Sequence, residues 1–156
     1  MPTFSSSDKR VITIRAPQDQ VIQALTEPDR IKEALADELE SSAKVDEHTV
    51  RWIRKPVEEK GVRFRGDYVV QYAYDGRGKV SWHTIGQGNM RSNGEALLAA
   101  APDGGTRVEY SESIECDMEV NRILAAVLRP IVERKIKSGV GDYLAHVKAR
   151  LEHASH

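Results

Sequence analysis

The hydrophobic pattern changes its period along this chain, and that change restricts the fold more than any other feature. Between residues 38 and 116 apolar and polar residues alternate, which is typical of strands with one buried face. Short runs rich in Gly, Asn and Asp interrupt the alternation at Val45–His48, Lys60-Gly61, Asp75–Gly78, Gln87–Asn89 and Asp103–Gly105. These residues adopt positive φ readily, so the runs predict tight turns. Strands joined so closely must pair antiparallel, because a parallel pair needs a crossover of about a dozen residues.

Two kinds of segment are predicted before this region. Lys9–Ala16 carries spaced β-branched residues and predicts a strand, which Pro17 ends. Proline is tolerated in the first helical turn, and helical spacing continues up to Glu27-Pro28 through Val21, Ile22 and Leu25. A second short helix is predicted from Asp29, with one apolar side formed by Ile31, Ala34 and Leu35.

After Asp117 the apolar residues follow a period of 3.6, which predicts one long terminal helix. Its expected buried stripe consists of Val120, Ile123, Leu124, Val127, Ile131, Val140, Tyr143, Leu144, Val147 and Leu151. Pro130 removes a backbone hydrogen bond, and Gly139 and Gly141 cost backbone entropy. We therefore expect this helix to be kinked and weakened.

An antiparallel sheet with one apolar face must cover that face, and the terminal helix is the predicted element long enough to do so. We predict an α+β, helix-grip fold, in which a curved antiparallel sheet of about seven strands carries two short helices and the long C-terminal helix packed across it. The sequence shows no composition break, repeat or linker. Residues 1–156 are therefore expected to form a single domain with a core at about 9–152.

Composition limits the function classes. The chain is 40% hydrophobic and 30% charged, as in a globular protein, and it has no apolar run long enough for a membrane span. A net charge of −1 lacks the general basic field of a nonspecific nucleic-acid binder. The single cysteine, Cys116, excludes an internal disulfide, and the first residues lack a signal-peptide pattern. We expect a cytoplasmic protein.

The alternation also assigns the faces of the strands. Even positions are apolar in residues 62–74 and 106–116, whereas in residues 39–45 the odd positions are expected to face inward. On the expected inner face, large aromatic residues adjoin very small ones: Trp52, Tyr68, Tyr72, Trp82 and Tyr110 beside Ala43, Gly66, Gly94 and Ala96. Small residues on a curved sheet either let the helix approach closely or leave a hollow. The pattern favours an aromatic pocket, with ordinary core packing as the alternative.

One acidic residue falls on this apolar face. Glu112 lies between Tyr110 and Ile114, where a carboxylate needs a partner, a hydrogen bond or a proton. It is the weak candidate for a catalytic residue, and the alternative is a strand-end side chain that reaches water at the rim. Arg54 is also inward by parity but lies near Pro56 at the end of its strand. On this pattern neither residue is assigned to a reaction.

Standard catalytic and metal-binding patterns are missing from the sequence. It contains no Gly-x-Ser-x-Gly elbow and no phosphate loop, and Gly86-Gln87-Gly88 fits a hairpin turn better than a dinucleotide loop. Cys116 is interpreted as a core residue. The histidines lack the spacing of a metal set and are interpreted as solvated: His48, His83, His146, His153 and His156. We expect no metal and no cofactor.

Two segments resemble a known superfamily. The first runs from Ile14-Arg15-Ala16-Pro17 through Thr26-Glu27-Pro28, and the second joins Gly94-Glu95-Ala96 to Asp103–Tyr110. Both are similar to motifs of the START-like superfamily of polyketide cyclase/dehydrase and lipid-transport proteins, the SRPBCC type, and the resemblance extends over residues 9–152. It implies a cavity between the sheet and the C-terminal helix that binds an apolar small molecule or lipid. It implies no shared catalytic residue.

We therefore predict a binding or carrier module for a hydrophobic small molecule or lipid. The residues expected to contact the ligand are Trp52, Tyr68, Tyr72, Trp82, Tyr110, Glu112, Ile123, Val127 and Ile131. The alternative is a cyclase, dehydratase or hydrolase that uses the same cavity. In that case Glu112 would be the general acid or base, and Tyr110 or Tyr72 would donate a hydrogen bond to an oxyanion.

A third interpretation is a protein that docks a partner through the outer sheet face or the first two helices. Its signature would be an exposed apolar patch, which the alternation of the strands does not show. The basic run formed by Arg51, Arg54, Lys55, Arg63 and Arg65 is diluted by acidic residues and is interpreted as a solvated face. We expect no nucleic-acid partner, and a homodimer is left open.

Overall fold

The computed structural model describes residues 2–154. Its helices are α1 (Gln18–Thr26), α2 (Pro28–Ala34) and α3 (Arg122–Ala154), with short 3-10 turns η1 (Ala36–Glu38) and η2 (Pro102–Gly104). Its strands are β1 (Thr3–Ile14), β2 (Leu39–Asp46), β3 (Thr49–Arg54), β4 (Val57–Glu59), β5 (Val62–Phe64), β6 (Asp67–Tyr74), β7 (Lys79–Ile85), β8 (Met90–Ala100) and β9 (Thr106–Asp117).

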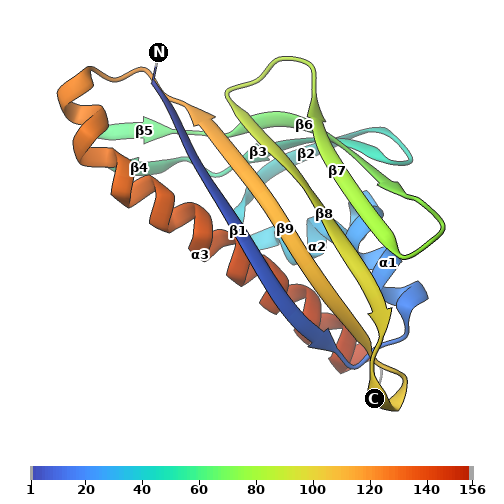
Figure 1. The fold of residues 1–156 in the computed structure, drawn as a ribbon. Helices are drawn as coiled ribbons and strands as arrows, with labels where there is room; N and C mark the ends of the chain where they lie inside the picture. Colours follow the sequence, from blue (N-terminus) through green and yellow to red (C-terminus); the bar gives the residue numbers. More distant parts are fainter. Residues whose placement is uncertain (1, 155–156) are drawn as a thin grey trace.

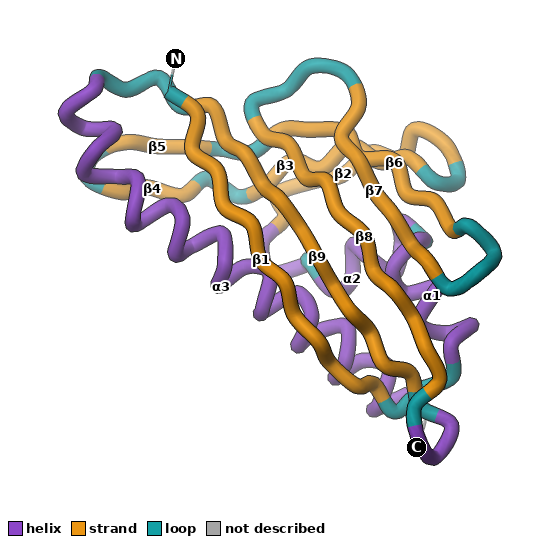
Figure 2. The backbone as a smooth tube through the Cα atoms, viewed as in Figure 1, coloured by secondary structure: helices purple, strands orange, loops and turns teal. Residues whose placement is uncertain are grey.

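Seven strands form one antiparallel sheet in the order β1-β9-β8-β7-β6-β3-β2. The helix α3 lies along one face of this sheet, and α1 and α2 cover the same face near the C-terminal end of α3 (Figures 1 and 2). This arrangement confirms the predicted α+β helix-grip fold. None of the helices within residues 2–154 is both long enough and apolar enough to cross a membrane.

The first strand is longer than predicted. It begins at Thr3 rather than Lys9 and pairs with β9 along its whole length, from Thr3 opposite Asp117 to Ile14 opposite Thr106. The sequence hid this extension because three serines follow Phe4 and weaken the apolar alternation. Phe4 itself is fully buried. Burial of this one ring therefore marks the true start of the strand.

The predicted inward positions of the second strand are wrong after Leu39. Leu39 pairs with Arg54, but the next pair joins Ser41 to Ile53, so one extra residue is inserted at this point. A one-residue slip sends every later side chain to the opposite face. Ser42 consequently lies opposite the buried Trp52, while the residues expected inside are exposed: Ser41, Ala43 and Val45.

Two of the predicted strands are each divided. Lys55-Pro56 separates β3 from β4, and Arg65-Gly66 separates β5 from β6. Proline has no N–H to donate to a strand ladder, which ends the pairing of β3 at this point. The short strands β4 and β5 form a separate hairpin, turned by positive φ angles of 51° at Lys60 and 80° at Gly61. The hairpin lies beside the first half of α3 (Figure 1).

The predicted stripe of α3 is correct in its second half and wrong in its first. Val140, Leu144, Val147 and Leu151 are buried, but Ile123 is 82% exposed and Val127 is 48% exposed. The inward positions of the first half are Ala125 and Leu128, which pack in a second apolar cluster with Phe4 and Met118. Both sets of residues keep a spacing of three to four, so the period alone cannot choose between them. The helix continues through Pro130.

A substitution at Gly94 on β8 tests the packing that positions the aromatic residues of the sheet. Gly94 pairs with Trp82 of β7 and Glu112 of β9. An added Cβ would meet the Ser111 carbonyl oxygen and would lie 2.6 Å from the Trp82 ring. We expect Gly94→Ala to lower the free energy of unfolding by about 2 kcal/mol. The reason is that the Ser111 backbone cannot move away from the added methyl group as a flexible side chain could. Urea denaturation of the purified variant measures this change.

The matched control is a glycine with room for a methyl group. A Cβ at Gly139, inside α3, would meet only the Glu38 carboxylate at 3.9 Å. Gly139→Ala should therefore raise the free energy of unfolding by about 0.5–1 kcal/mol, because alanine restricts the unfolded chain. Equal effects of the two substitutions would contradict this account of Gly94.

Candidate functional site

A cavity of about 540 Å³ lies between the sheet, η1 and α3. Its sheet wall includes Trp52, Tyr68, Tyr72, Trp82, Met90 and Tyr110, and its helix wall includes Leu128, Val132, Ile136, Val140 and Tyr143. Aromatic rings meet across it, since Trp82 stacks on Tyr110 with centroids 4.9 Å apart, and Tyr110 lies 6.3 Å from Tyr143. The space is large enough for a ligand of several rings or a short acyl chain.

The structure brings together the sheet residues of the predicted site. Trp52, Tyr68, Tyr72, Trp82, Tyr110 and Glu112 all line the cavity. The predicted helix residues do not line the cavity. Ile123 and Val127 are exposed, and Ile131, although half-buried, also lies outside the cavity wall. The inward face of α3 lies one position further along, which places Leu128 and Val132 at the wall instead. Contact of the sheet residues with a ligand remains a prediction.

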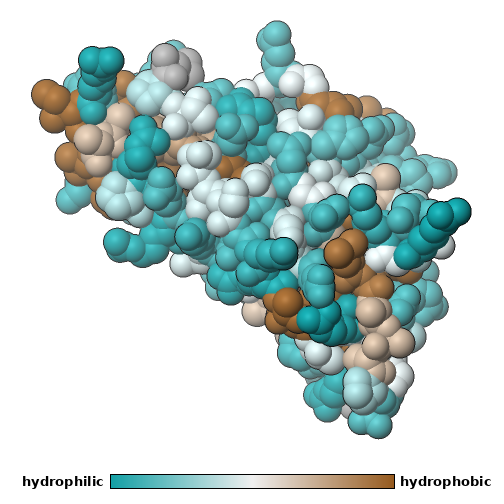
Figure 3. All heavy atoms as spheres, viewed as in Figure 1, coloured by the Kyte–Doolittle hydropathy of each residue, from teal (hydrophilic) through white to brown (hydrophobic). Residues whose placement is uncertain are grey.

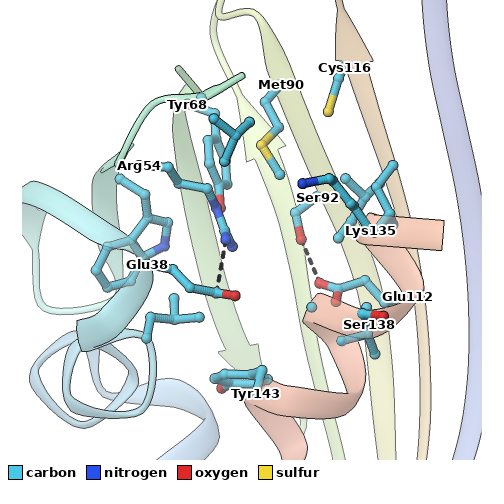
Figure 4. A pocket seen from close by; sticks show the side chains of 18 of the residues that line it. Glu38, Arg54, Tyr68, Met90, Ser92, Glu112, Cys116, Lys135, Ser138 and Tyr143 are labelled. Carbon is cyan, nitrogen blue, oxygen red and sulfur yellow. Dashed lines mark hydrogen bonds and ion pairs between the residues drawn. The ribbon is translucent and has the colours of Figure 1, made fainter. Parts of the chain in front are cut away.

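Glu112 of β9 is the acidic group on the apolar wall. Its Oε2 accepts hydrogen bonds from Ser92 Oγ at 2.6 Å and from Trp82 Nε1 at 3.0 Å. Its Oε1 accepts one from Tyr110 OH at 3.2 Å. Figure 4 shows Glu112 and Ser92 facing one another from neighbouring strands. Glu112 is thus a hydrogen-bonded, half-buried cavity residue rather than a solvated side chain at a strand end.

Burial raises the pKa of the Glu112 carboxyl above its ordinary value. The hydrogen bonds from Ser92 and Trp82 and the charge of Arg54 act in the opposite direction but do not cancel it. The pKa of the Tyr110 hydroxyl is raised well above its usual range, first by burial and then by the Glu112 charge. Tyr110 therefore stays protonated near neutral pH and can keep donating to Glu112.

Arg54 of β3 places a cation on another wall. Its Nε donates to Tyr68 OH at 3.0 Å, and its Nη1 donates to Glu38 Oε2 at 3.0 Å. Burial by itself would lower the pKa of the guanidinium, but Tyr68, Glu38 and Glu112 outweigh burial and raise it. Arg54 is therefore charged, and Figure 4 shows its guanidinium facing Glu38 inside the cavity. Parity had placed Arg54 inward, but its acidic partner on η1 was not predicted.

Several further cavity residues were missed, among them Ser92, Tyr143 and Glu38. Ser92 continues the inward parity of Gly94 and Ala96 on β8, so extending the alternation by one step would have found it. Tyr143 belonged to the predicted helix stripe but was not assigned to the site. Glu38 lies in the short turn η1 before β2, where no periodic pattern operates. Only the tertiary arrangement brings Glu38 to Arg54.

The mouth of the cavity is marked by wall residues that are also exposed. Asp37, Lys55 and Val57 lie on one side, and Lys135, Ser138 and Asp142 of α3 lie on the other. Lys135 Nζ forms an ion pair with Glu59 Oε1 at 2.7 Å, which joins β4 to α3 across this opening. The cavity therefore opens between the β4–β5 hairpin and the middle of α3.

The remaining candidate groups lie elsewhere or are inert. Cys116 is buried, and burial raises the pKa of its thiol to about 11, so it is not a thiolate at neutral pH. Among residues 2–154, no group of three or more His, Cys, Asp and Glu side chains is arranged to hold a metal ion. His156 lies outside the described residues. On the outer sheet face Arg51 pairs with Asp67 at 2.6 Å and Arg65 with Glu40 at 3.2 Å.

The sheet, the crossing helix and the aromatic cavity define a START-like helix-grip protein. Residues 2–152 match the family described as "Polyketide cyclase / dehydrase and lipid transport", and the chain belongs to this family. The match confirms the resemblance found in the two sequence motifs. A comparison with curated protein sequences finds no match.

Solved structures share the fold over nearly the whole chain. A protein of Thermus thermophilus, TTHA0849, is 20% identical, with a TM-score of 0.69 over 97% of this chain and 99% of that one. The Zhui aromatase/cyclase of a Streptomyces species is 15% identical, with a TM-score of 0.68 over 97% and 96%. A START superfamily protein of Mycobacterium smegmatis is 12% identical, with a TM-score of 0.64 over 95% and 98%.

The pKa of Glu112 gives the stability a defined pH dependence. Because the folded protein holds this proton more tightly than the unfolded chain, its free energy of unfolding should fall as the pH rises above 4.5, until the folded pKa is passed. Glu112→Gln cannot titrate, and its amide can still accept from Ser92 and Trp82. The stability of this variant relative to the natural protein should therefore increase over that range, measured by urea unfolding at a series of pH values.

Glu152 provides the control, because its pKa is lowered whereas that of Glu112 is raised. Bonds from the Arg15 backbone N–H and the Lys148 ammonium hold the pKa of its carboxyl at about 2. Its stabilising effect is complete above pH 4.5 and is lost as the pH falls toward 2. The loss in free energy of unfolding caused by Glu152→Gln should therefore become smaller as the pH falls toward 2. A stability difference for Glu112→Gln that does not change with pH would refute the raised pKa.

Proposed function

We propose that this protein binds an apolar or amphipathic small molecule, such as a lipid or an aromatic polyketide-like compound, in the cavity under α3. The observation that carries the proposal is the aromatic-walled space of about 540 Å³ with a mouth to solvent. Ligand pockets typically combine such apolar walls with a few well-placed polar groups. We propose a binding or carrier role in the cytosol, where a free thiol such as Cys116 is stable.

The polar groups restrict what such a ligand must carry. Oε2 of Glu112 already accepts two hydrogen bonds, whereas Oε1 accepts one and keeps room for a second donor. Arg54 uses Nε and Nη1 in the two bonds described above, which leaves further guanidinium N–H groups for an acceptor. A mostly apolar ligand with one hydrogen-bond donor and one acceptor therefore fits both walls.

Support also comes from family membership. The family description joins cyclisation or dehydration of polyketides with lipid transport, and both activities involve largely apolar molecules. One structural relative is an aromatase/cyclase and another is a START superfamily protein. These relatives favour a cavity ligand for this chain without choosing between carriage and catalysis.

Gly139→Leu tests occupancy of the cavity. Gly139 lines the cavity wall on α3, and a Cβ there would meet only the Glu38 carboxylate, at 3.9 Å, so a leucine at this position should occupy cavity space. We expect at least about a tenfold loss of affinity for a fluorescent fatty acid or an anilinonaphthalene sulfonate probe, because the side chain removes binding volume. Fluorescence titration measures the dissociation constant.

Ala145→Leu is the matched control, because Ala145 lies on the same helix but is exposed. It should bind the probe like the natural protein. If no apolar probe binds the natural protein, or if Gly139→Leu binds as tightly, the cavity is not a ligand site and the proposal fails.

A second candidate function is catalysis in the same cavity, and the hydrogen-bonded Glu112 favours it. A carboxyl whose pKa is raised above its ordinary value by burial is suited to general acid or base work. Tyr72 OH accepts from Trp52 Nε1 at 3.0 Å and is free to donate its own proton, whereas the Tyr110 proton is directed at Glu112. Of the two tyrosines, Tyr72 is therefore the better donor to an oxyanion.

Once a compound that the protein converts has been found, Glu112→Gln distinguishes catalysis from ligand binding alone. The amide keeps the shape and the acceptor of the side chain but cannot transfer a proton. If Glu112 is catalytic, kcat should fall by at least about 100-fold with little change in the dissociation constant of the substrate. Mass spectrometry of the products follows turnover. Retained turnover, or equal loss of binding and turnover, would leave the carrier function alone.

A further inference from the structure

The first half of α3 presents an apolar and basic face to solvent. Ile123 is 82% exposed and Val127 is 48% exposed, and Ala126 and Pro130 are exposed beside them. The same side of the helix continues into the exposed Arg134 and Lys137, because positions 123, 127, 130, 134 and 137 recur every three to four residues. We call these six residues the α3 outer face.

Apolar residues lie on the surface at this end of the molecule, as they also do at other places on the same side. Figure 3 shows hydrophobic residues gathered at the end that holds the start of α3. Val57 of the neighbouring hairpin is also 48% exposed. Exposed apolar clusters of this kind mark contact surfaces more often than isolated apolar side chains do.

The charge of the same segment favours one kind of contact surface. Residues 122–137 hold five basic residues, of which Lys135 is paired with Glu59, and one acidic residue, although the chain as a whole carries a net charge of −1. A second copy docked by two-fold symmetry would bring these basic segments together, which disfavours a homodimer through this face. An anionic surface is favoured instead.

We propose that the α3 outer face docks the protein on an anionic lipid bilayer. The apolar side chains stand on a convex helix and form no groove for a matching partner, and a bilayer interface requires no matching shape. Helices that lie on membranes combine apolar residues that enter the interface with Lys and Arg that meet anionic headgroups. Ile123 and Val127 supply the first contribution, and Arg134 and Lys137 supply the second.

Docking through this face would bring the cavity mouth close to the bilayer. Lys135 and Ser138 mark the mouth on the adjoining side of the same helix. An apolar ligand could then pass between the bilayer and the cavity with little exposure to water. This last step rests on the proposed function, whereas docking itself does not.

Vesicle co-sedimentation tests the docking. The natural protein should sediment with vesicles of phosphatidylglycerol and phosphatidylcholine in equal parts, and hardly at all with pure phosphatidylcholine. Binding should weaken as salt rises from about 0.05 M to 0.5 M, because salt screens the charges. Ile123→Asp, and the pair Arg134→Glu with Lys137→Glu, should each lower the vesicle partition coefficient by at least about tenfold.

Matched controls carry the same changes elsewhere. Val45→Asp replaces an apolar residue that is 62% exposed on β2, and the pair Lys9→Glu with Arg77→Glu reverses two exposed charges outside α3. Both controls should bind vesicles more tightly than the α3 variants, and Val45→Asp should bind like the natural protein. Unchanged thermal unfolding of the Ile123→Asp variant shows that its loss of binding is not a loss of folding.

The opposite results are equally definite. No sedimentation with anionic vesicles at low salt, or equal binding by the natural protein and the α3 variants, would overturn the docking proposal. A dimer in analytical ultracentrifugation that Ile123→Asp abolishes would identify a second copy as the occupant and would also overturn it. Probe binding to the cavity, measured without vesicles, should be unchanged in Ile123→Asp, so failure of docking and failure of the ligand site are distinguished.

Discussion

The structure depends on how α3 is held against the sheet. Two separate apolar clusters fix it: Ala125 and Leu128 pack with Phe4 and Met118 near its start, and Val140, Leu144 and further residues join the main core toward its end. The cavity lies under the segment between these clusters. Because the sheet is curved, a helix anchored at both ends spans a gap that its side chains do not fill.

The polar groups in this gap would be costly in a closed core. A buried carboxylate or guanidinium needs partners to offset the loss of hydration. Glu112 has three hydrogen-bond donors, and Arg54 has a carboxylate and a tyrosine oxygen. The apolar packing of Trp82 on Gly94 contributes to this network, because it aims the indole N–H at Glu112. Packing and polar chemistry in the cavity are therefore parts of one arrangement.

Several features were predictable because they depend on local patterns. Alternation placed the aromatic residues and Glu112 on one face, and turn residues located the hairpins between most strands. The family motifs indicated the same fold. Other features depend on a partner distant in sequence: the β2 register on a bulge opposite β3, the start of β1 on the burial of Phe4, and the inward face of α3 on the Phe4 cluster. Local patterns contain no information about these partners.

The amino-acid sequence by itself determined the order of the elements, the antiparallel pairing and the apolar face that closes under a long helix. These follow from side-chain period and turn chemistry, which act within a few residues. The tertiary structure alone decided that a hollow remains, that Glu38 meets Arg54, and that Ile123 and Val127 face outward. The physical reason is that a void, an ion pair between segments and the rotation of a helix are set by how separate elements pack, and several packings satisfy the same local pattern.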